Sequence, residues 1–346
     1  MSKTALITGI SGQDGAYLSH LLLQKGYRVL GAVRRIAAPS MTRLTELGIE
    51  DDVELVEFEL IELTNMMRAL ERTKPDEIYN LAAQSFVGLS FEQPIYTAEI
   101  NALGVSRLLE AIRTINPKIR FYQASTSEMF GKVADPTKPQ SETTPFHPRS
   151  PYGVAKLFAH WLTINYRESY GFFGACGILF NHESPLRGSE FVTRKITAGL
   201  AQVKHGRRDV LALGNLEAKR DWGFAGDFVE GMWRMLQQSE GDDYVLATGT
   251  SNTVRHFVEL ATERLGFAVD WTGKGDQEHA VDRKNGKTIV RVDPQLYRPA
   301  EVNVLIGDAS KAKKKLGWTP GTDLTQLVTM MAEADDRRVR ENRLFF

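Results

Sequence analysis

The sequence predicts an α/β protein in which a doubly wound parallel sheet is joined to a smaller, mostly C-terminal α/β domain. Three observations support this fold class. Short apolar runs alternate with amphipathic helical segments through the first half of the chain, as they do in βαβ units. A glycine-rich turn follows the first apolar run, at residues 9–15. The length of 346 residues is enough for about two domains.

The first half of the chain contains the elements of the expected sheet. Each predicted strand is a short apolar run, and each predicted helix repeats apolar residues on one face, as Leu18, Leu21 and Leu22 do. The strands cover residues 5–8, 28–33, 53–58, 77–81, 120–125 and 174–181, and the helices cover residues 17–24, 65–72, 102–115 and 156–170. We expect right-handed crossovers between neighbouring strands.

The second half of the chain is less regular. Helices are predicted over residues 191–205, 227–238, 254–265, 309–316 and 324–340, and strands over residues 210–213 and 244–247. Residues 271–287 are rich in Gly, Lys and Asp, so we expect a mobile excursion there. The pattern assigns residues 1–180 and about 215–250 to the first domain, and about 181–214 and 251–346 to the second.

Composition and charge exclude several classes of protein. Hydrophobic residues make up 42% and charged residues 25% of the chain, and 43 basic residues balance 43 acidic ones. A neutral chain of this kind is not expected to bind nucleic acid through a broad basic surface. No apolar run approaches the roughly 18 residues of a membrane span, and the N-terminal run is too short for a signal peptide. We therefore expect a cytoplasmic protein.

Cys176 is the single cysteine. One cysteine excludes an internal disulfide and a cysteine-rich zinc site, so no metal is expected. Cys176 lies within an apolar run at residues 175–180, which predicts a buried thiol in a strand rather than a nucleophile.

The glycine-rich turn predicts a dinucleotide site. Gly9 permits the tight turn after the first strand, Gly12 lets a pyrophosphate approach the backbone, and Gly15 allows the helix to pack closely. The N-terminus of the following helix offers free N–H groups to an anion. The spacing, with two residues between successive glycines, also fits a plain glycine-rich turn. Its place at the first strand–helix junction favours the Rossmann interpretation.

The end of the second strand indicates which dinucleotide is bound. Arg34 and Arg35 stand where a site for NAD usually carries an acidic residue for the ribose hydroxyl. Arginine suits the 2′-phosphate of NADP. The alternative is that both are surface arginines.

Tyr152 and Lys156 are four residues apart, so they share one face of a helix. A lysine in this position can hold the ribose of a cofactor, and its charge can lower the pKa of the tyrosine. Such a phenol can take a proton from an alcohol while hydride leaves for a nicotinamide.

Thr126 and Glu128 follow the fifth strand, at the edge of the sheet that faces the ligand in doubly wound folds. Simple oxidation of an alcohol does not need a glutamate beside the tyrosine. A second proton transfer, from carbon, does need one, and this indicates oxidation followed by elimination. The alternative is that both residues only cap the next segment.

Taken together, these motifs resemble the extended short-chain dehydrogenase/reductase superfamily, whose fourth-strand motif matches residues 80–85. Within that superfamily the chain most resembles the GDP-mannose 4,6-dehydratases. The matching segments are residues 123–128, 181–185, 191–195, 218–223 and 298–302, and the likeness extends from Thr8 to Trp318. The related dTDP-glucose dehydratases are less similar, since they carry Asp where Ser127 stands.

The resemblance implies NADP-dependent dehydration of GDP-D-mannose to GDP-4-keto-6-deoxy-D-mannose, a hydro-lyase reaction in which hydride moves internally from C4 to C6. Tyr152 would take the C4 hydroxyl proton and Thr126 would bond the C4 oxygen. Glu128 would take the C5 proton and assist the loss of water from C6. The first domain would bind the dinucleotide and the second domain the nucleotide sugar.

The resemblance also implies two sets of binding residues. The cofactor set comprises Gly9, Ser11, Gly12, Gln13, Asp14, Gly15, Arg34, Arg35, Glu59, Leu60, Leu81, Ala82, Ala83, Gln84, Ser85, Tyr96, Lys156, His182 and Arg187. The substrate set comprises Ser85, Asn181, Thr193, Lys195, Arg220, Arg298 and Glu301. The physical reason for the basic members is that a diphosphate needs Arg and Lys donors in a partly dry cleft.

The chain departs from the family pattern at several positions. Glu59 replaces an Asp that contacts adenine in many relatives, and Phe86, Leu186 and Phe224 stand where His, Arg and His are common. These positions are expected near sugar and cofactor. A GDP-D-glycero-manno-heptose is therefore an alternative substrate, and a GDP-4-keto-6-deoxy-sugar reductase or epimerase is an alternative activity that would not need Glu128. A non-enzymatic NADP sensor would need none of the catalytic residues.

Relatives of this kind are homodimers or homotetramers. The resemblance implies that the helices at residues 102–115 and 156–170 pair across a two-fold axis. It also implies that residues 35–43 join dimers into tetramers.

Overall fold

A computed structural model describes residues 2–37, 40–135, 137–297 and 305–343. Its largest element is a seven-stranded sheet with the strand order β11-β6-β5-β4-β1-β2-β3, and every neighbouring pair in it is parallel. The strands are β1 (Thr4–Thr8), β2 (Arg28–Val33), β3 (Glu54–Glu57), β4 (Glu77–Asn80), β5 (Arg120–Thr126), β6 (Gly174–Leu179) and β11 (Asp243–Leu246). The strand order reverses between β1 and β4, so a ligand crevice is expected at their carboxyl ends.

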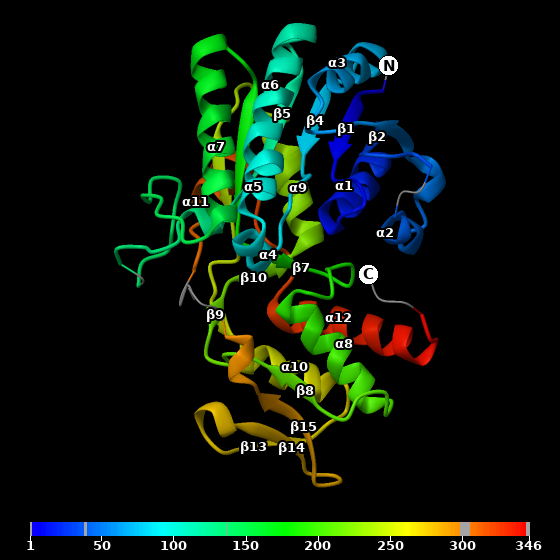
Figure 1. The fold of residues 1–346 in the computed structure, drawn as a ribbon, viewed down its shortest axis with the longest axis vertical. Coiled ribbons are helices and arrows are strands. Elements are labelled where there is room, and N and C mark those ends of the chain that lie inside the picture. The colour runs from blue at the N-terminus through cyan, green and yellow to red at the C-terminus, as the bar shows by residue number, and fades with distance from the viewer. Residues whose placement is uncertain (1, 38–39, 136, 298–304, 344–346) are drawn as a thin grey trace.

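Helices cover both faces of this sheet, which confirms the predicted doubly wound α/β class (Figure 1). One face packs against α1 (Gln13–Gln24), α2 (Thr42–Glu46), α9 (Ala225–Met235) and α11 (Ser310–Leu316). The other face packs against α3 (Leu63–Thr73), α6 (Gly104–Ile115) and α7 (Pro151–Tyr170). Both cores consist of Leu, Ile, Val, Ala and aromatic side chains that are almost wholly buried.

Short elements connect these layers. They are η1 (Glu50–Asp52), α4 (Val87–Glu92), α5 (Pro94–Ala98), the π-helical η2 (Glu99–Leu103) and η3 (Ser127–Met129). The predicted helix at residues 102–115 therefore begins in a π-helical turn. The predicted strand at residues 174–181 is divided, because β6 ends at Leu179 and β7 (Asn181–Glu183) pairs instead with β10 (Trp222–Phe224).

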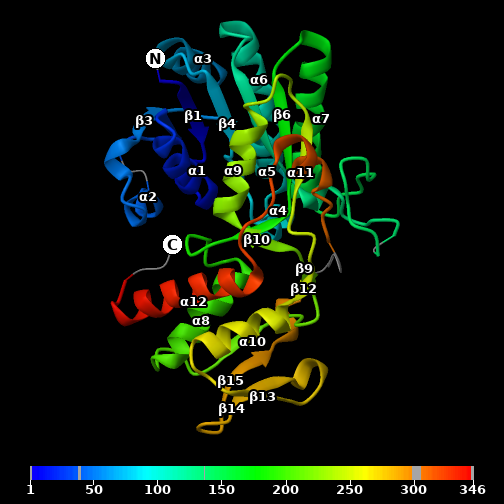
Figure 2. The same ribbon diagram turned by 180° about the vertical axis from the view of Figure 1, so that it is seen from behind.

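A second core lies below the carboxyl edge of the sheet (Figures 1 and 2). Three helices, α8 (Val192–Lys204), α10 (Val254–Arg264) and α12 (Leu324–Arg340), pack together there. They adjoin a four-stranded sheet in the order β13-β14-β15-β8. Its strands are β8 (Leu211–Leu213), β13 (Val269–Thr272), β14 (His279–Asp282) and β15 (Lys287–Val292). Smaller elements are β9 (Lys219–Arg220), β12 (Asn252–Thr253), η4 (Gly275–Gln277) and η5 (Pro294–Leu296).

The prediction of a mobile excursion at residues 271–287 is wrong. This segment spans β14 and its antiparallel pairings with β13 and β15. Ala280 is buried in the second core, whereas Lys274, Asp276 and Lys284 lie in the two connections between these strands and Asp282 is buried in β14. The Gly, Lys and Asp residues of these connections give the segment the composition of a loop, although short strands lie beside them.

The packing does not follow the predicted domain boundaries everywhere. Ala312, Leu316 and Trp318 pack with the first sheet although they were assigned to the second domain. Leu216 and Trp222 pack in the second core although they were assigned to the first. Within the described residues, no helix is long and apolar enough to cross a membrane.

Candidate active site

The glycine turn, residues 9–15, joins β1 to α1 at the carboxyl edge of the sheet. Gly9 has φ = +73°, and a Cβ there would lie 2.8 Å from the Ala82 nitrogen. A Cβ on Gly15 would lie 2.4 Å from the Gly9 carbonyl oxygen. Gly12 is the N-cap residue of α1, and no side chain of the described residues forms a capping hydrogen bond there. Only glycine therefore fits the turn at positions 9 and 15, and the first N–H groups of α1 can bind an anion.

Thr8 fastens the predicted fourth-strand motif to this turn. Its hydroxyl donates to the Asn80 side-chain oxygen at 2.7 Å and accepts from the backbone N–H groups of Leu81 and Ala82 at 3.1 Å. Further along, Gln84 and Asn101 exchange two hydrogen bonds of 2.9 and 2.8 Å. Residues 81–85 are thus held beside the glycine turn by side chains from β1 and η2.

Thr126 and Glu128 lie where β5 ends and η3 begins. The Thr126 hydroxyl accepts a hydrogen bond from the Glu128 N–H at 3.2 Å, so the threonine does cap the next segment. The start of α7 packs directly on this turn, because a Cβ on Gly153 would lie 2.9 Å from the Glu128 carbonyl oxygen. Ser150 caps α7 by accepting from the Gly153 N–H at 3.0 Å. This close packing brings Tyr152 beside Thr126 and Glu128.

Tyr152 and Lys156 are confirmed as neighbours on one helix, and both are buried. The expectation that lysine lowers the pKa of the tyrosine is not met in this structure. Burial raises the pKa of Tyr152, and a hydrogen bond with Thr126 only partly opposes that effect. The Lys156 ammonium donates to the Ala124 carbonyl at 2.8 Å and lies 6.0 Å from the centre of the Tyr152 ring. Removal of water therefore sets the direction of the shift in the Tyr152 pKa.

Replacing Lys156 by Met is expected to stabilise the fold at neutral pH. Burial lowers the pKa of Lys156 from 10.5 to about 8, so the unfolded chain binds this proton more tightly than the folded chain. The free energy of unfolding therefore rises with pH between about 8 and 10.5. Below that range the buried charge costs ~3 kcal/mol, from which ~1 kcal/mol for the lost hydrogen bond must be subtracted.

Thermal unfolding at neutral and alkaline pH measures this effect. Lys156→Met should melt at a higher temperature than the unsubstituted protein at neutral pH, and its advantage should shrink as the pH rises. Lys118→Met, at an exposed position, is the matched control and should melt like the unsubstituted protein. An unchanged or lower melting temperature for Lys156→Met at neutral pH would contradict the assigned burial cost.

His182 and Asp14 form an ion pair at the other side of the site. The His182 Nε2 atom lies 2.8 Å from the Asp14 carboxylate, and its Nδ1 atom lies 2.8 Å from the Phe180 carbonyl oxygen. The ring also stacks on Phe228. Although burial opposes a charge, Asp14 raises the pKa of His182, and His182 lowers the pKa of Asp14. An acceptor therefore lies at each ring nitrogen, an arrangement that favours the protonated imidazole.

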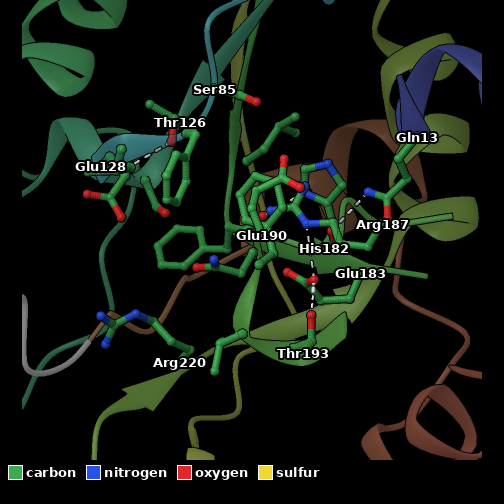
Figure 3. A pocket seen from close by; sticks show the side chains of 18 of the residues that line it. Gln13, Ser85, Thr126, Glu128, His182, Glu183, Arg187, Glu190, Thr193 and Arg220 are labelled. Atoms are coloured by element: carbon green, nitrogen blue, oxygen red, sulfur yellow. Dashed lines mark hydrogen bonds and ion pairs between the residues drawn. The ribbon is translucent and has the colours of Figure 1, made fainter. Parts of the chain in front are cut away.

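These elements enclose a cavity of about 490 Å³ between the sheet and the second core. Figure 3 shows Thr126 and Glu128 on one side of it, and Gln13, His182 and Arg187 on the other. The predicted site residues that line it are Gly9, Gly12, Gln13, Asp14, Gly15, Leu81, Ala83, Ser85, Thr126, Glu128, Tyr152, Lys156, Asn181, His182, Arg187, Thr193, Lys195 and Arg220. All four predicted catalytic residues therefore meet in one place.

The remaining predicted residues lie elsewhere. Those that do not line the cavity are Ser11, Arg34, Arg35, Glu59, Leu60, Ala82, Gln84 and Tyr96. Arg34 and Arg35 are exposed directly after β2, and Leu60 is buried in the core under the sheet. Their predicted cofactor contacts stay predictions. Arg298 and Glu301 lie outside the described residues.

Sequence reasoning missed a carboxylate in the cavity, Glu183. It is 2% exposed, accepts a hydrogen bond from the Thr193 hydroxyl, and pairs with the Arg187 Nε atom at 3.1 Å (Figure 3). The hydroxyl of Thr193, a residue predicted to bind substrate, thus donates its hydrogen bond to this carboxylate. The sequence did offer one signal for a site residue here, because Glu183 follows His182 within the family segment at residues 181–185. Glu190, Phe191, Asn215 and Trp222 also line the cavity without having been assigned a role.

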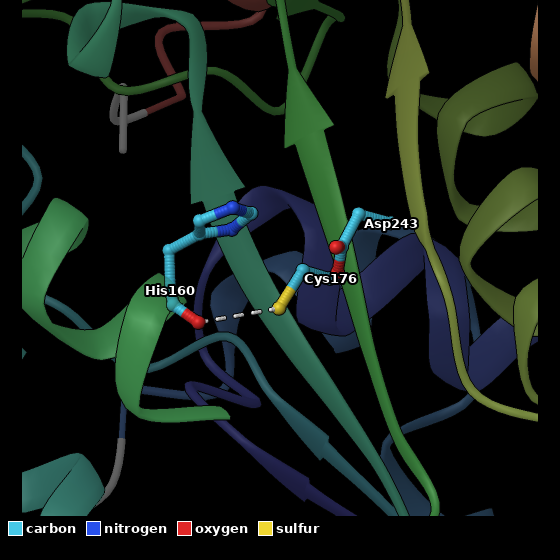
Figure 4. Close-up of side chains that lie close together, drawn as sticks. All are labelled: His160, Cys176 and Asp243. Carbon is cyan, nitrogen blue, oxygen red and sulfur yellow. Dashed lines mark hydrogen bonds between the residues drawn. The ribbon is translucent and has the colours of Figure 1, made fainter. Parts of the chain in front are cut away.

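Cys176 is a buried thiol in β6, as predicted. With His160 and Asp243 it forms a group whose possible ligand atoms lie within 4.8 Å of one another. The Cys176 thiol contacts the backbone carbonyl of His160 at 3.9 Å (Figure 4). Asp243 is paired with Arg167 at 3.0 Å, and the His160 Nδ1 atom lies 3.0 Å from the Ser125 hydroxyl. These groups already have partners within the protein.

Comparison with known proteins shows the family of this chain. The family model described as GDP-mannose 4,6 dehydratase matches residues 6–331. The chain belongs to the GDP-mannose 4,6-dehydratase family. The enzyme of that name from Sinorhizobium fredii is 50% identical over 99% of both chains. The one from Homo sapiens is 48% identical over 98% of this chain and 93% of its own.

Solved structures share the fold at lower identity. RMD from Pseudomonas aeruginosa, solved with NADPH, has a TM-score of 0.76 at 22% identity and covers 97% of this chain and 100% of its own. The dTDP-glucose 4,6-dehydratase from Bacillus anthracis, solved with NAD, has a TM-score of 0.80 at 19% identity and covers 98% of both chains.

Three of the four departures from the GDP-mannose 4,6-dehydratase pattern, Phe86, Leu186 and Phe224, differ in their surroundings. Phe86 lines the cavity, and its ring lies 6.3 Å from that of Phe191. Leu186 is 1% exposed and packs in the core with α1 and α9. Phe224 packs edge-to-face on Tyr17. Neither Leu186 nor Phe224 lines the cavity, so of the three only Phe86 is placed to contact a bound sugar.

Proposed function

We propose that this protein catalyses the NADP-dependent dehydration of GDP-D-mannose to GDP-4-keto-6-deoxy-D-mannose. The observation that carries the proposal is that Thr126, Glu128, Tyr152 and Lys156 line the same cavity as the glycine turn. A reductase or epimerase has no need of Glu128 in that set, and a cofactor sensor needs none of the four. The membership of the family supports the same reaction.

The residues present fit a dinucleotide phosphate. The crowding around Gly9 and Gly15 brings the backbone of the turn close to its neighbours, and the start of α1 offers N–H groups to a pyrophosphate. Arg34 and Arg35 follow β2, at the same sheet edge as the turn, and support NADP over NAD. The nicotinamide, when bound, supplies a hydride acceptor for C4 and a hydride donor for C6.

Tyr152 takes the proton of the C4 hydroxyl as that carbon is oxidised to the ketone. Thr126, whose hydroxyl interacts with Tyr152, holds the C4 oxygen beside the phenol. Lys156 is buried four residues further along α7, where its ammonium holds the ribose of the cofactor. Because burial raises the pKa of Tyr152, the hydrogen bond with Thr126, which opposes that shift, assists the proton transfer.

Glu128 moves the protons of the elimination. The C4 ketone acidifies the C5–H bond, and the Glu128 carboxylate takes that proton. The same group then protonates the C6 hydroxyl as water leaves. Tyr152 returns the proton that it took from the C4 hydroxyl to C5 as hydride adds at C6, so both residues end in their starting states. The cycle consumes one molecule of GDP-mannose and yields one ketosugar and one water, with no net oxidation.

The nucleotide sugar extends toward the second core. Asn181, Lys195 and Arg220 line that part of the cavity, and Lys and Arg are the donors that a diphosphate requires. Arg298 and Glu301 belong to the proposed substrate set on the family resemblance alone. We place the dinucleotide with the first sheet and the nucleotide sugar with the second core, as two interleaved domains.

The oligomeric state and location complete the proposal. The α7 surface exposes Val154, Phe158 and Trp161, and α5 exposes Ile95, 81% of which is accessible. Apolar surface of this kind favours pairing of two copies into a homodimer through these helices. Residues 35–43, of which 38–39 lie outside the described residues, remain the proposed contact of a tetramer. We place the protein in the cytoplasm, where nucleotide sugars are available.

Incubation with GDP-mannose tests the function. The purified protein, with no cofactor added, is expected to form a product lighter by one water, and denaturation of the protein should release NADP. Release of NAD would contradict the assignment of Arg34 and Arg35. Loss of water from GDP-D-glycero-manno-heptose but not GDP-mannose would change the substrate. Stoichiometric consumption of added NADPH without loss of water would replace the dehydratase with a reductase.

A further inference from the structure

Three charged side chains are buried together where α8 crosses α12. Arg194 and Asp335 are 0% exposed and Arg338 is 1% exposed. The Asp335 carboxylate accepts three hydrogen bonds. They come from the Nε atom of Arg194 at 3.0 Å, the Nη1 atom of Arg338 at 3.1 Å and the hydroxyl of Thr197 at 2.6 Å. None of these residues lines the cavity. Arg194 belongs to the family segment at residues 191–195, but it is in neither the cofactor set nor the substrate set.

Both arginines donate hydrogen bonds to backbone carbonyls of a segment beside the cavity, residues 184–188. The Pro185 carbonyl accepts from the Nη1 atoms of Arg194 and Arg338 at 2.8 and 2.9 Å, and the Arg187 carbonyl accepts from Arg194 at 2.7 Å. Arg187 itself lines the cavity and lies over the ring of Phe191. Two buried cations thus fix the backbone on both sides of Arg187, the residue of this segment that lines the cavity.

Helix α2 connects the same segment to the glycine turn. Arg43 donates to the Leu186 carbonyl at 2.7 Å and to the Ser11 carbonyl at 2.9 Å. Glu46, one turn further along α2, accepts from Arg338 at 3.1 Å. The contacts therefore form a closed path from the glycine turn through α2 and α12 to residues 184–188.

Stability alone does not account for this arrangement. A buried ion pair gains little over well-packed apolar side chains, because the loss of water offsets its attraction. What apolar side chains cannot do is hold specific carbonyl groups at fixed positions. We propose that Arg194, Asp335, Arg338 and Arg43 are positioning residues, which set residues 184–188 relative to the glycine turn and so determine the affinity for the dinucleotide. This inference rests on the proposed function of the cavity.

Asp335→Asn and Asp336→Asn form a matched pair for the test. The two residues are adjacent on α12, but Asp336 pairs at the surface with Lys204 and His205. Calorimetric titration with NADP⁺, after removal of bound nucleotide, gives the affinity of each variant. Asp335→Asn should bind NADP⁺ about tenfold more weakly, because small displacements of a binding group are costly. Its kcat at saturating NADP⁺ should stay within about threefold of the unsubstituted protein. Asp336→Asn should match the unsubstituted protein in both.

Hydrogen exchange provides a readout that does not depend on catalysis. The amides of Leu186, Arg187 and Gly188 should exchange faster in Asp335→Asn, while those of β4 and β5 should not change. If Asp335→Asn does not fold, Arg43→Met is the second variant, because Arg43 is less buried than Asp335. It removes the hydrogen bonds from α2 to the Leu186 and Ser11 carbonyls and should also weaken NADP⁺ binding. A folded variant with unchanged affinity, or a merely lower melting temperature, would show a structural role only and overturn the inference. Failure of the unsubstituted protein to bind NADP⁺ would instead overturn the proposed function and this inference with it.

Discussion

Glu128→Gln is expected to lower the rate of water loss from GDP-mannose by about 10²–10⁴-fold, the usual contribution of a general acid–base group. Glutamine keeps the size of the side chain but cannot accept the C5 proton. Oxidation at C4 depends on Tyr152 and precedes this step. The variant should therefore accumulate reduced nicotinamide after GDP-mannose is added, and its absorbance band measures that accumulation directly.

Glu71→Gln is the control for this variant, because Glu71 is exposed on α3 and remote from the cavity. It should form the dehydrated product at the rate of the unsubstituted protein. Normal product formation by Glu128→Gln would remove Glu128 from the reaction. Complete loss of both product and reduced nicotinamide would place Glu128 in the oxidation step, contrary to the assignment made here.

Tyr152→Phe is expected to lower the rate by a similar factor of about 10²–10⁴, but at the first step. Phenylalanine fills the same space without the group that takes the C4 hydroxyl proton. Neither reduced nicotinamide nor the dehydrated product should accumulate. The two variants thus separate the oxidation from the elimination, and a single absorbance measurement distinguishes them.

Tyr170→Phe is the matched control on the same helix, since Tyr170 is 55% exposed at the end of α7. Binding of NADP⁺ by Tyr152→Phe should be nearly unchanged, which separates a lost proton acceptor from a lost fold. Reduced nicotinamide formed at the normal rate in Tyr152→Phe would assign the first proton transfer to another group.

The sequence was most informative where function depends on local spacing. Tyr152 and Lys156 share a face because any helix brings residues four apart together, and the structure shows them both in α7. Thr126 and Glu128 line the same cavity as the glycine turn, because parallel strands end at one edge of the sheet. Glu183 was missed because nothing in its local spacing shows that Arg187 and Thr193 surround it.

Elements that depend on distant partners were predicted less well. The strands β13 to β15 pair with one another and with β8, more than fifty residues earlier in the chain, so their polar composition suggested a loop. The direction of the pKa shift of Tyr152 was also misjudged. It depends on how completely α7 and η3 exclude water from the phenol, which a spacing of four residues does not reveal.

The sequence by itself determined the α/β class, the glycine turn and the four residues proposed for the chemistry, because each follows from short-range spacing and strand order. The tertiary structure alone decided which groups are buried and which charges meet. The pair of Asp14 with His182 joins residues 168 positions apart, and Arg194 reaches Asp335 across 141 positions. Packing at such distances fixes the local dielectric and the partners of each charge. These contacts set the ionisation of the site and the position of the backbone around it.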